Sequence, residues 1–231
     1  MTSLVWNDKV VRGLILDMDG VVVNSRAAHQ ESWRRFIEEE NLPVDPEEFL
    51  LKIFGQGKND NIPLAFGRDD LQQAFIDEKA ARIEQGFLQL MREGKVPPVP
   101  GVLDFLRDMK ARGLALCLGT SAPRENLELV VEKFELAPLL DATVSEEDVL
   151  RTKPAPDIFL KCCERLALPA EECVVFEDSI HGMTAAREAG CRVVGLATTH
   201  PREKLLPHCE ICVADFEELR TAIPWAVNKN P

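Results

Sequence analysis

The segment LILDMDGVVVNS, residues 14–25, is an apolar run that ends in two aspartates separated by one residue. Charged side chains are costly inside a buried strand, so Asp17 and Asp19 mark the point where this strand leaves the core. A lone pair of this kind is typical of a solvated turn. A chemical role for these aspartates therefore depends on partners elsewhere in the chain.

Composition restricts the class of partner. The chain has 231 residues, of which 45% are hydrophobic and 29% charged, as in ordinary globular proteins. Lys and Arg total 27 against 39 Asp and Glu, a formal net charge of −12. An acidic surface repels phosphate backbones and anionic lipid, so we expect neither nucleic acid nor membrane as a partner. An anionic substrate would need a metal ion or selected Lys and Arg side chains.

The seven cysteines follow no disulfide framework of a small secreted domain. Cys209 and Cys212 have CxxC spacing, but no second CxxC or His pair accompanies them, so we expect no zinc site. The N-terminal residues contain no apolar stretch typical of a signal peptide or a membrane span. We therefore expect reduced core cysteines and a cytoplasmic location. The sequence leaves the oligomeric state open, with a monomer favoured.

Short β-branched runs alternate with amphipathic segments at helical spacing. The predicted strands cover residues 11–16, 114–118, 142–144, 173–176, 192–196 and 211–213. The predicted helices between them cover residues 102–111, 124–134, 157–166, 183–189 and 216–223. This alternation predicts an α/β fold, a Rossmann-like and mostly parallel sheet with helices on both faces.

One region departs from the alternation, because residues 26–94 carry apolar side chains at spacings of three and four with no convincing strand. The pattern predicts helices within 27–40, 45–54 and 69–94, and a Gly-flanked polar loop, FGQGKND, at 54–60. We therefore predict an all-helical cap domain over 25–97. It is inserted into an α/β core domain formed by 1–24 and 98–231.

Polar residues follow several predicted strands, where open α/β sheets bind their ligands. In a parallel sheet the strand ends meet at one rim, so these side chains should converge there. They are Asp17 and Asp19 after the first strand, Thr120 and Ser121 after the second, Glu177 and Asp178 after the strand at 173–176, and Lys153 before an intervening helix.

Clustered carboxylates repel one another unless cations are present, and Mg²⁺ takes oxygen ligands that it readily shares with a phosphate. With the Lys153 charge and the Thr120 hydroxyl added, the set predicts phosphoryl transfer to a carboxylate nucleophile. Each piece alone has an ordinary explanation. Lys153 could be a surface lysine, and the residues from Glu177 to Ser179, like Thr120 and Ser121, could cap helices. The ordered combination favours the chemical interpretation.

Four segments, DMDGVVVNS, LGTSA, KPAPDIF and VVFEDSIHGMTAAREAG, resemble the four ordered motifs of the haloacid dehalogenase superfamily. The helical insertion lies where that superfamily carries an α-helical cap. Within the superfamily the chain looks most like the branch that contains small-metabolite phosphatases and β-phosphoglucomutase.

The resemblance implies a role for each matching residue. Asp17 would be the nucleophile that forms an aspartyl-phosphate, and Asp19 would be the general acid and then the general base. True dehalogenases and phosphonatases lack an aspartate at the second position, which favours phosphate ester chemistry. Thr120 would bind the transferring phosphoryl group, and Lys153 would hold Asp17 and stabilise developing charge.

The resemblance also implies a Mg²⁺ site. Its ligands would be the Asp17 carboxylate, the Asp19 backbone carbonyl and Asp178. Glu177 would contribute directly or through water.

Several residues of the cap and the core are candidate substrate contacts. In the cap, His29 could face the site or be structural, and Gly55 and Lys58 belong to a loop that resembles the branch's specificity loop. Lys58 falls where the mutase has an arginine, but an exposed turn explains it equally well. In the core, Ser121 and Arg124 are candidate substrate contacts, although Arg124 could simply begin a helix.

These observations predict a Mg²⁺-dependent phosphatase of a small phosphorylated metabolite, a sugar phosphate by resemblance. A β-phosphoglucomutase-like isomerase is the alternative. A non-catalytic phosphometabolite-binding protein is disfavoured, because every catalytic position is intact.

Overall fold

The structure is a computed structural model that describes residues 4–53, 58–223 and 226–227. The chain divides into two compact units, which we call the core unit (residues 1–24 and 98–231) and the cap unit (residues 25–97).

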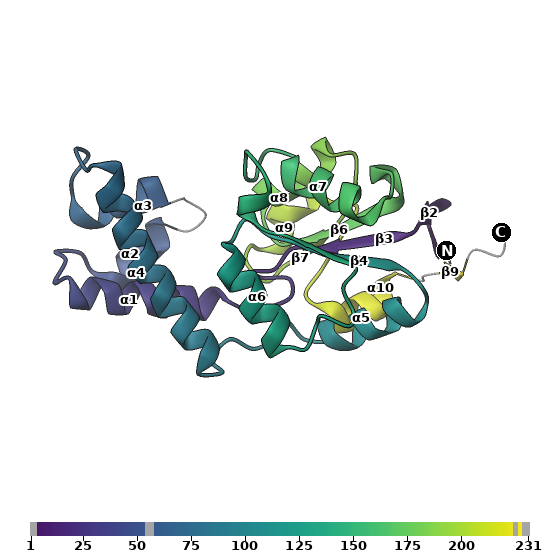
Figure 1. Ribbon diagram of the computed structural model, residues 1–231, viewed down its shortest axis with the longest axis horizontal. Coiled ribbons are helices and arrows are strands. Elements are labelled where there is room, and N and C mark those ends of the chain that lie inside the picture. The colour runs from purple at the N-terminus through teal and green to yellow at the C-terminus, as the bar shows by residue number, and fades with distance from the viewer. Residues whose placement is uncertain (1–3, 54–57, 224–225, 228–231) are drawn as a thin grey trace. The chain divides into compact units, whose positions relative to one another are not determined.

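A six-stranded sheet forms the centre of the core unit (Figure 1). Its strands are β3 (Gly13–Leu16), β4 (Ala115–Gly119), β5 (Ala142–Val144), β6 (Cys173–Glu177), β7 (Arg192–Leu196) and β8 (Ile211–Val213). All neighbours are parallel, in the order β5-β4-β3-β6-β7-β8. This is the doubly wound Rossmann order, in which the direction of strand addition reverses between β3 and β6. The predicted fold class is confirmed.

Helices cover both faces of this sheet. They are α5 (Val102–Ala111), α6 (Arg124–Lys133), α7 (Asp157–Leu166), α8 (Ile180–Glu188), α9 (Arg202–Leu205) and α10 (Phe216–Ala222). Side chains alternate along each strand, so Ile15 and Val175 pack in one cluster with residues of α7 and α8. Phe176 instead contacts Phe105 of α5 and Phe216 of α10. Figure 1 shows these two helix pairs on opposite faces.

The predicted strand at 11–16 is confirmed over 13–16 as β3, but Val11 belongs to a second, antiparallel sheet. Its strands are β1 (Leu4–Trp6), β2 (Lys9–Val11) and β9 (Ala226–Val227). Asn7 and Asp8 have φ angles of 48° and 61°, which form the two-residue turn that joins β1 to β2. The Asn-Asp pair between two apolar runs is the sequence signal for this hairpin.

The described residues of the cap unit are helical apart from their connecting segments. The helices are α1 (Arg26–Glu39), α2 (Pro46–Lys52), α3 (Lys58–Phe66) and α4 (Gln73–Arg92). Phe36 is buried among Ile62, Ile76 and Ile83, and Trp33 packs against the same cluster. Both aromatic residues therefore belong to the core of the cap unit.

The predicted polar loop at 54–60 is wrong at its C-terminal end, because α3 begins at Lys58. Pro63 lies inside this helix, where proline costs about 3 kcal/mol, so the sequence predicts no helix there. Ile62 and Ala65 are completely buried, and their burial offsets that cost. Gly55 lies outside the described residues.

The seven cysteines are unpaired, and all but the half-buried Cys209 are buried, which confirms that they belong to the core. Within the described residues, the helices are too short or too polar to cross a membrane.

Candidate active site

The parallel sheet brings the ends of β3, β4 and β6 to one rim of the core unit. Leu16 lies opposite Phe176 on one side and Leu118 on the other. The Asp17 backbone N–H extends the ladder by donating to the Phe176 carbonyl at 3.0 Å. Asp17 therefore lies where the strand order reverses, which is where doubly wound folds bind ligands.

Lys153 links two buried carboxylates at this point. Its Nζ lies 2.5 Å from Asp17 Oδ1 and 2.6 Å from Glu177 Oε1. The lysine side chain is only 9% exposed. Burial opposes its charge, but the two carboxylates outweigh burial and raise the pKa of Lys153 above its usual value. The lysine therefore remains a fixed cation beside the proposed nucleophile, and it is not a surface residue.

Burial disfavours the charged form of the carboxyl groups at this site. Burial raises the pKa of Asp17 to about 7, with Glu177 and Asp19 adding to the shift and Lys153 opposing it. Burial, Glu177 and Asp17 also raise the pKa of Asp178 well above its usual value. One lysine does not neutralise this group of acids, so the site favours a further cation.

Glu177 also orders the segment that follows β6. Its Oε2 accepts hydrogen bonds from the Asp178 and Ser179 backbone N–H groups and from the Ser179 hydroxyl, at 2.9–3.0 Å. Ser179 in turn caps α8, because its Oγ accepts from the Gly182 N–H at 3.0 Å. A Cβ on Gly182 would lie 1.8 Å from Glu177 Oε1, so glycine is required there. Oε1 accepts a hydrogen bond from Lys153, so an ion bound directly to Glu177 would share an oxygen that already has a donor.

The donor set fits Mg²⁺. Ligand oxygens of Asp17, Glu177 and Asp178 all lie within 4.8 Å of one another, and all three residues are buried. Gly20 has a φ of +73°, and a Cβ at this position would lie 1.8 Å from Asp178 Oδ2, so the backbone after Asp19 approaches that carboxylate closely. Carboxylate and backbone carbonyl oxygens are the ligands that this cation prefers. The Asp19 carboxylate lies outside this group of three.

The raised pKa values predict that Mg²⁺ binding depends on pH. Below about 7, Asp17 holds a proton in the metal-free protein, and the pKa of Asp178 is raised as well. A cation must displace these protons, so its apparent affinity should fall as the pH drops from about 7, by up to about tenfold per pH unit for each proton displaced. The Mg²⁺-induced rise in melting temperature, measured without substrate at several pH values, tests this. A pH-independent affinity would contradict it.

Thr120 and Ser121 follow β4 on the same rim. The Thr120 Oγ1 accepts a hydrogen bond from the Ala122 N–H at 3.0 Å, which leaves its own proton to donate. The Ser121 Oγ is buried and has no hydrogen-bond partner among the described residues. A buried hydroxyl without a partner is costly, so a ligand oxygen at this position would be favoured.

The remaining candidates have structural partners of their own. Arg124 begins α6, and its Nη2 lies 2.9 Å from Asp148 Oδ1. In the cap unit, the His29 ring stacks on Phe87 at 4.1 Å between centroids. The backbone of Lys58 lies in the first turn of α3. Their contacts with substrate remain predictions.

Two threonines at the rim escaped the sequence analysis. Thr198 and Thr199 follow β7, which is paired with β6. Thr198 Oγ1 donates to the Gly20 carbonyl at 2.6 Å, and Thr199 is hydrogen-bonded to the Asp178 side chain. The signal was available, because LATTH places polar residues after a predicted strand, as at the other three strand ends.

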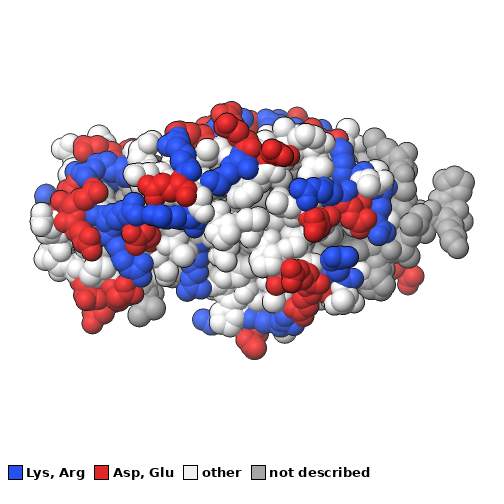
Figure 2. All heavy atoms as spheres, turned by 90° about the horizontal axis from the view of Figure 1, so that it is seen from below, with Lys and Arg blue, Asp and Glu red and all other residues white. Residues whose placement is uncertain are grey.

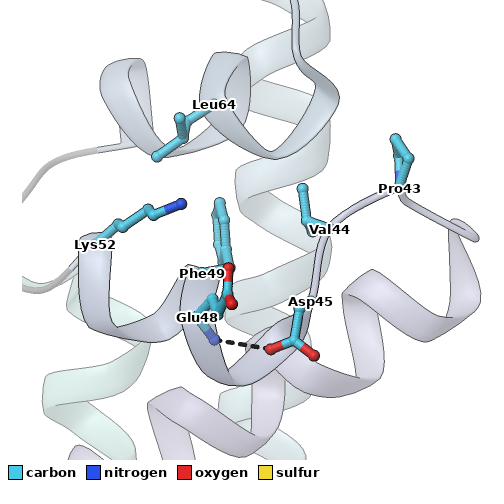
Figure 3. Close-up of a pocket in the computed structure, with 7 residues that line it drawn as sticks. All are labelled: Pro43, Val44, Asp45, Glu48, Phe49, Lys52 and Leu64. Carbon is cyan, nitrogen blue, oxygen red and sulfur yellow. Dashed lines mark hydrogen bonds between the residues drawn. The ribbon is translucent and has the colours of Figure 1, made fainter.

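A shallow pocket of about 220 Å³ lies on the cap unit (Figure 3). Phe49 and Lys52 of α2 point toward Leu64 of α3 across it. Asp45 at its edge caps α2 by accepting from the Glu48 N–H at 2.9 Å. The residues that line this pocket do not include a cluster of carboxylates around a buried cation, so the rim of the core unit remains the candidate active site.

The surface carries charge of both signs. On the face in Figure 2, Lys and Arg lie in small groups beside Asp and Glu, without a continuous basic area of the kind that binds a phosphate backbone.

Comparison with known proteins identifies relatives of this chain. The profile of the haloacid dehalogenase-like hydrolases matches residues 14–196. The fructose-1-phosphate phosphatase YqaB of Escherichia coli (strain K12) is 31% identical over 79% of this chain and 94% of its own length. The validoxylamine A 7'-phosphate phosphatase of Streptomyces hygroscopicus subsp. limoneus is 28% identical over 89% and 94%.

Among solved structures, a Thermotoga maritima protein provisionally named β-phosphoglucomutase aligns with a TM-score of 0.75 and 26% identity, over 92% of this chain and 98% of that one. With the profile match over most of its length, this chain belongs to the haloacid dehalogenase-like hydrolase family.

Proposed function

We propose that this chain is a Mg²⁺-dependent phosphatase that hydrolyses a small sugar phosphate through a phosphorylated Asp17. The observation that carries the proposal is the buried cluster in which Lys153 bridges Asp17 and Glu177, with Asp178 beside them. Two relatives support it, since they are named as phosphatases of fructose 1-phosphate and of validoxylamine A 7'-phosphate. We expect the reaction to take place in the cytoplasm.

In the first step, a carboxylate oxygen of Asp17 attacks phosphorus, and the bond to the ester oxygen of the substrate breaks. Lys153 supports this step in two ways. It opposes the rise in the pKa of Asp17 that burial causes, and its positive charge would lie next to the phosphoryl oxygens as charge develops on them. Glu177 retains Lys153 in place once Asp17 has become an acyl phosphate and lost its charge.

Asp19 is the proposed proton carrier. It donates a proton to the departing alcohol and then removes one from the water that hydrolyses the acyl phosphate. The hydroxyls of Thr120 and Ser121 would donate to phosphoryl oxygens, because one has a proton available and the other lacks a partner.

The Asp17 and Asp178 carboxylates and the Asp19 carbonyl would hold Mg²⁺, with Glu177 nearby. When bound, the cation would neutralise charge on the carboxylates and on the phosphoryl group. For the rest of the substrate, we propose contacts with Arg124 in the core unit and with His29, Gly55 and Lys58 in the cap unit.

The test is inorganic phosphate release with Mg²⁺ across a panel of sugar phosphates that includes fructose 1-phosphate. Release from at least one compound, abolished by a chelator, is the expected result. The mutase alternative predicts instead that β-glucose 1-phosphate becomes glucose 6-phosphate without net phosphate release. Binding without turnover of any compound would indicate a non-catalytic protein.

A further inference from the structure

The segment after β7 forms a further part of the rim. Gly195 of β7 pairs with Glu177 of β6, so β7 ends beside the acidic residues. The next residue, Ala197, is anchored to the edge strand, because its N–H donates to the Val213 carbonyl at 2.8 Å. The backbone that leads into Thr198 and Thr199 is therefore held in place next to the metal-binding carboxylates.

Thr198 fixes the turn that carries Asp19. Its Oγ1 donates to the Gly20 carbonyl at 2.6 Å, across 178 residues of sequence. The turn is closed on its other side by the Gly20 N–H, which donates to the Val23 carbonyl at 2.8 Å. The Thr198 hydroxyl thus holds the peptide immediately after the proposed acid–base residue.

Thr199 fixes the metal-binding carboxylate on the other side of the same glycine. Its side chain is hydrogen-bonded to the Asp178 carboxylate. The point that a Gly20 Cβ would occupy lies 1.8 Å from Asp178 Oδ2 and 2.9 Å from Thr199 Oγ1. Gly20, Asp178 and Thr199 are therefore in close contact, and Asp178 is only 5% exposed. A buried carboxylate held in this way has little freedom to change its rotamer.

We infer that Thr199 is a positioning residue for the Mg²⁺ site, which it serves by orienting the Asp178 carboxylate, while Thr198 fixes the adjoining Asp19-Gly20 turn. The inference rests on the proposed function in taking Mg²⁺ as the cation. Groups that orient metal ligands typically contribute about 10- to 100-fold to metal affinity. Thr199 transfers no proton during the proposed reaction. Its substitution should therefore weaken metal binding and leave the chemical step nearly unchanged.

The test compares Thr199→Val with Thr199→Ser. Valine keeps the shape of threonine but cannot donate, whereas serine keeps the hydroxyl. Mg²⁺ binding is followed without substrate, by the rise in melting temperature during a Mg²⁺ titration. Thr199→Val should bind Mg²⁺ about 10- to 100-fold more weakly, Thr199→Ser should bind as the unmodified protein does, and kcat at saturating Mg²⁺ should change by only a few-fold.

Thr184→Val is the matched control. Its Oγ1 donates within α8 to the Ile180 carbonyl at 2.8 Å, so Mg²⁺ affinity should be unchanged. If Thr199→Val does not fold in chelator, Thr199→Ala against Thr199→Ser isolates the hydroxyl in the same way.

Equal Mg²⁺ affinity in Thr199→Val and the unmodified protein would overturn the inference while leaving the phosphatase proposal intact. Conversely, weaker Mg²⁺ binding by the variant, with no phosphate released from any compound by the unmodified protein, would support the inference and reject the proposed function.

Discussion

Asp17→Asn should abolish phosphate release and leave the fold at least as stable as before. The amide cannot attack phosphorus, and removal of a nucleophile commonly lowers kcat by about 10⁴-fold or more. The pKa of Asp17 is raised from 3.8 to about 7, so at a pH near 8 the ionised carboxylate destabilises the fold relative to its protonated form. Asparagine resembles that protonated form.

Phosphate release with Mg²⁺ measures the loss of activity, and thermal unfolding in chelator measures the change in stability. Both are measured at a pH near 8. Asp104→Asn is the control, because Asp104 is an exposed residue of α5 whose side chain is 75% accessible. It should change neither quantity. Residual turnover by Asp17→Asn at a comparable rate would remove the aspartyl-phosphate mechanism, and a large fall in melting temperature would contradict the burial argument.

Lys153→Met should damage both stability and activity, and Mg²⁺ should partly restore the stability. Methionine fills a similar volume but leaves Asp17 and Glu177 buried without their bridging cation. Removing one partner from a buried ion pair costs about 3 to 5 kcal/mol, and losing a donor to the transition state lowers kcat by about 10²- to 10³-fold. Bound Mg²⁺ would neutralise the same carboxylates, so the loss of stability should be largest in chelator.

Denaturant unfolding with chelator and with Mg²⁺ measures this difference. Lys161→Met on α7 is the control, because Lys161 forms an exposed ion pair with Glu164 that contributes little. If Lys153→Met were as stable as the unmodified protein in chelator, the bridge would not hold the acidic cluster together.

The sequence predicted the parts of the fold that depend on local pattern. Apolar runs buried on both faces predicted β3, β4, β6 and β7, and helical spacing predicted the cap helices α1 and α4, because each pattern follows from burial alone. The pattern failed where local propensity opposed the tertiary structure. Pro63 concealed α3, whose burial of Ile62 and Ala65 offsets its cost. The hairpin of β1 and β2 was missed for another reason, since its turn residues Asn7 and Asp8 do signal it but the run that follows them was predicted as one strand.

The sequence predicted which residues form the candidate site better than it predicted how they are arranged. The ordered motifs singled out Asp17, Lys153, Glu177 and Asp178, since each follows a strand or precedes a helix at the rim. Their distances depended on the strand order, because the adjacency of β3 and β6 joins segments separated by most of the chain. The same adjacency decided that Lys153 bridges two carboxylates and is not a surface lysine.

By itself, then, the sequence LILDMDGVVVNS determined that two aspartates stand at the end of a buried strand, and the other motifs determined which residue types would join them. The tertiary structure alone decided which oxygens face one another, that Gly20 lies against Asp178, and that Thr198 and Thr199 complete the rim. The physical reason is that hydrophobic patterning is local in sequence. The electrostatic and hydrogen-bond contacts of a site instead form between segments that only the packed sheet brings together.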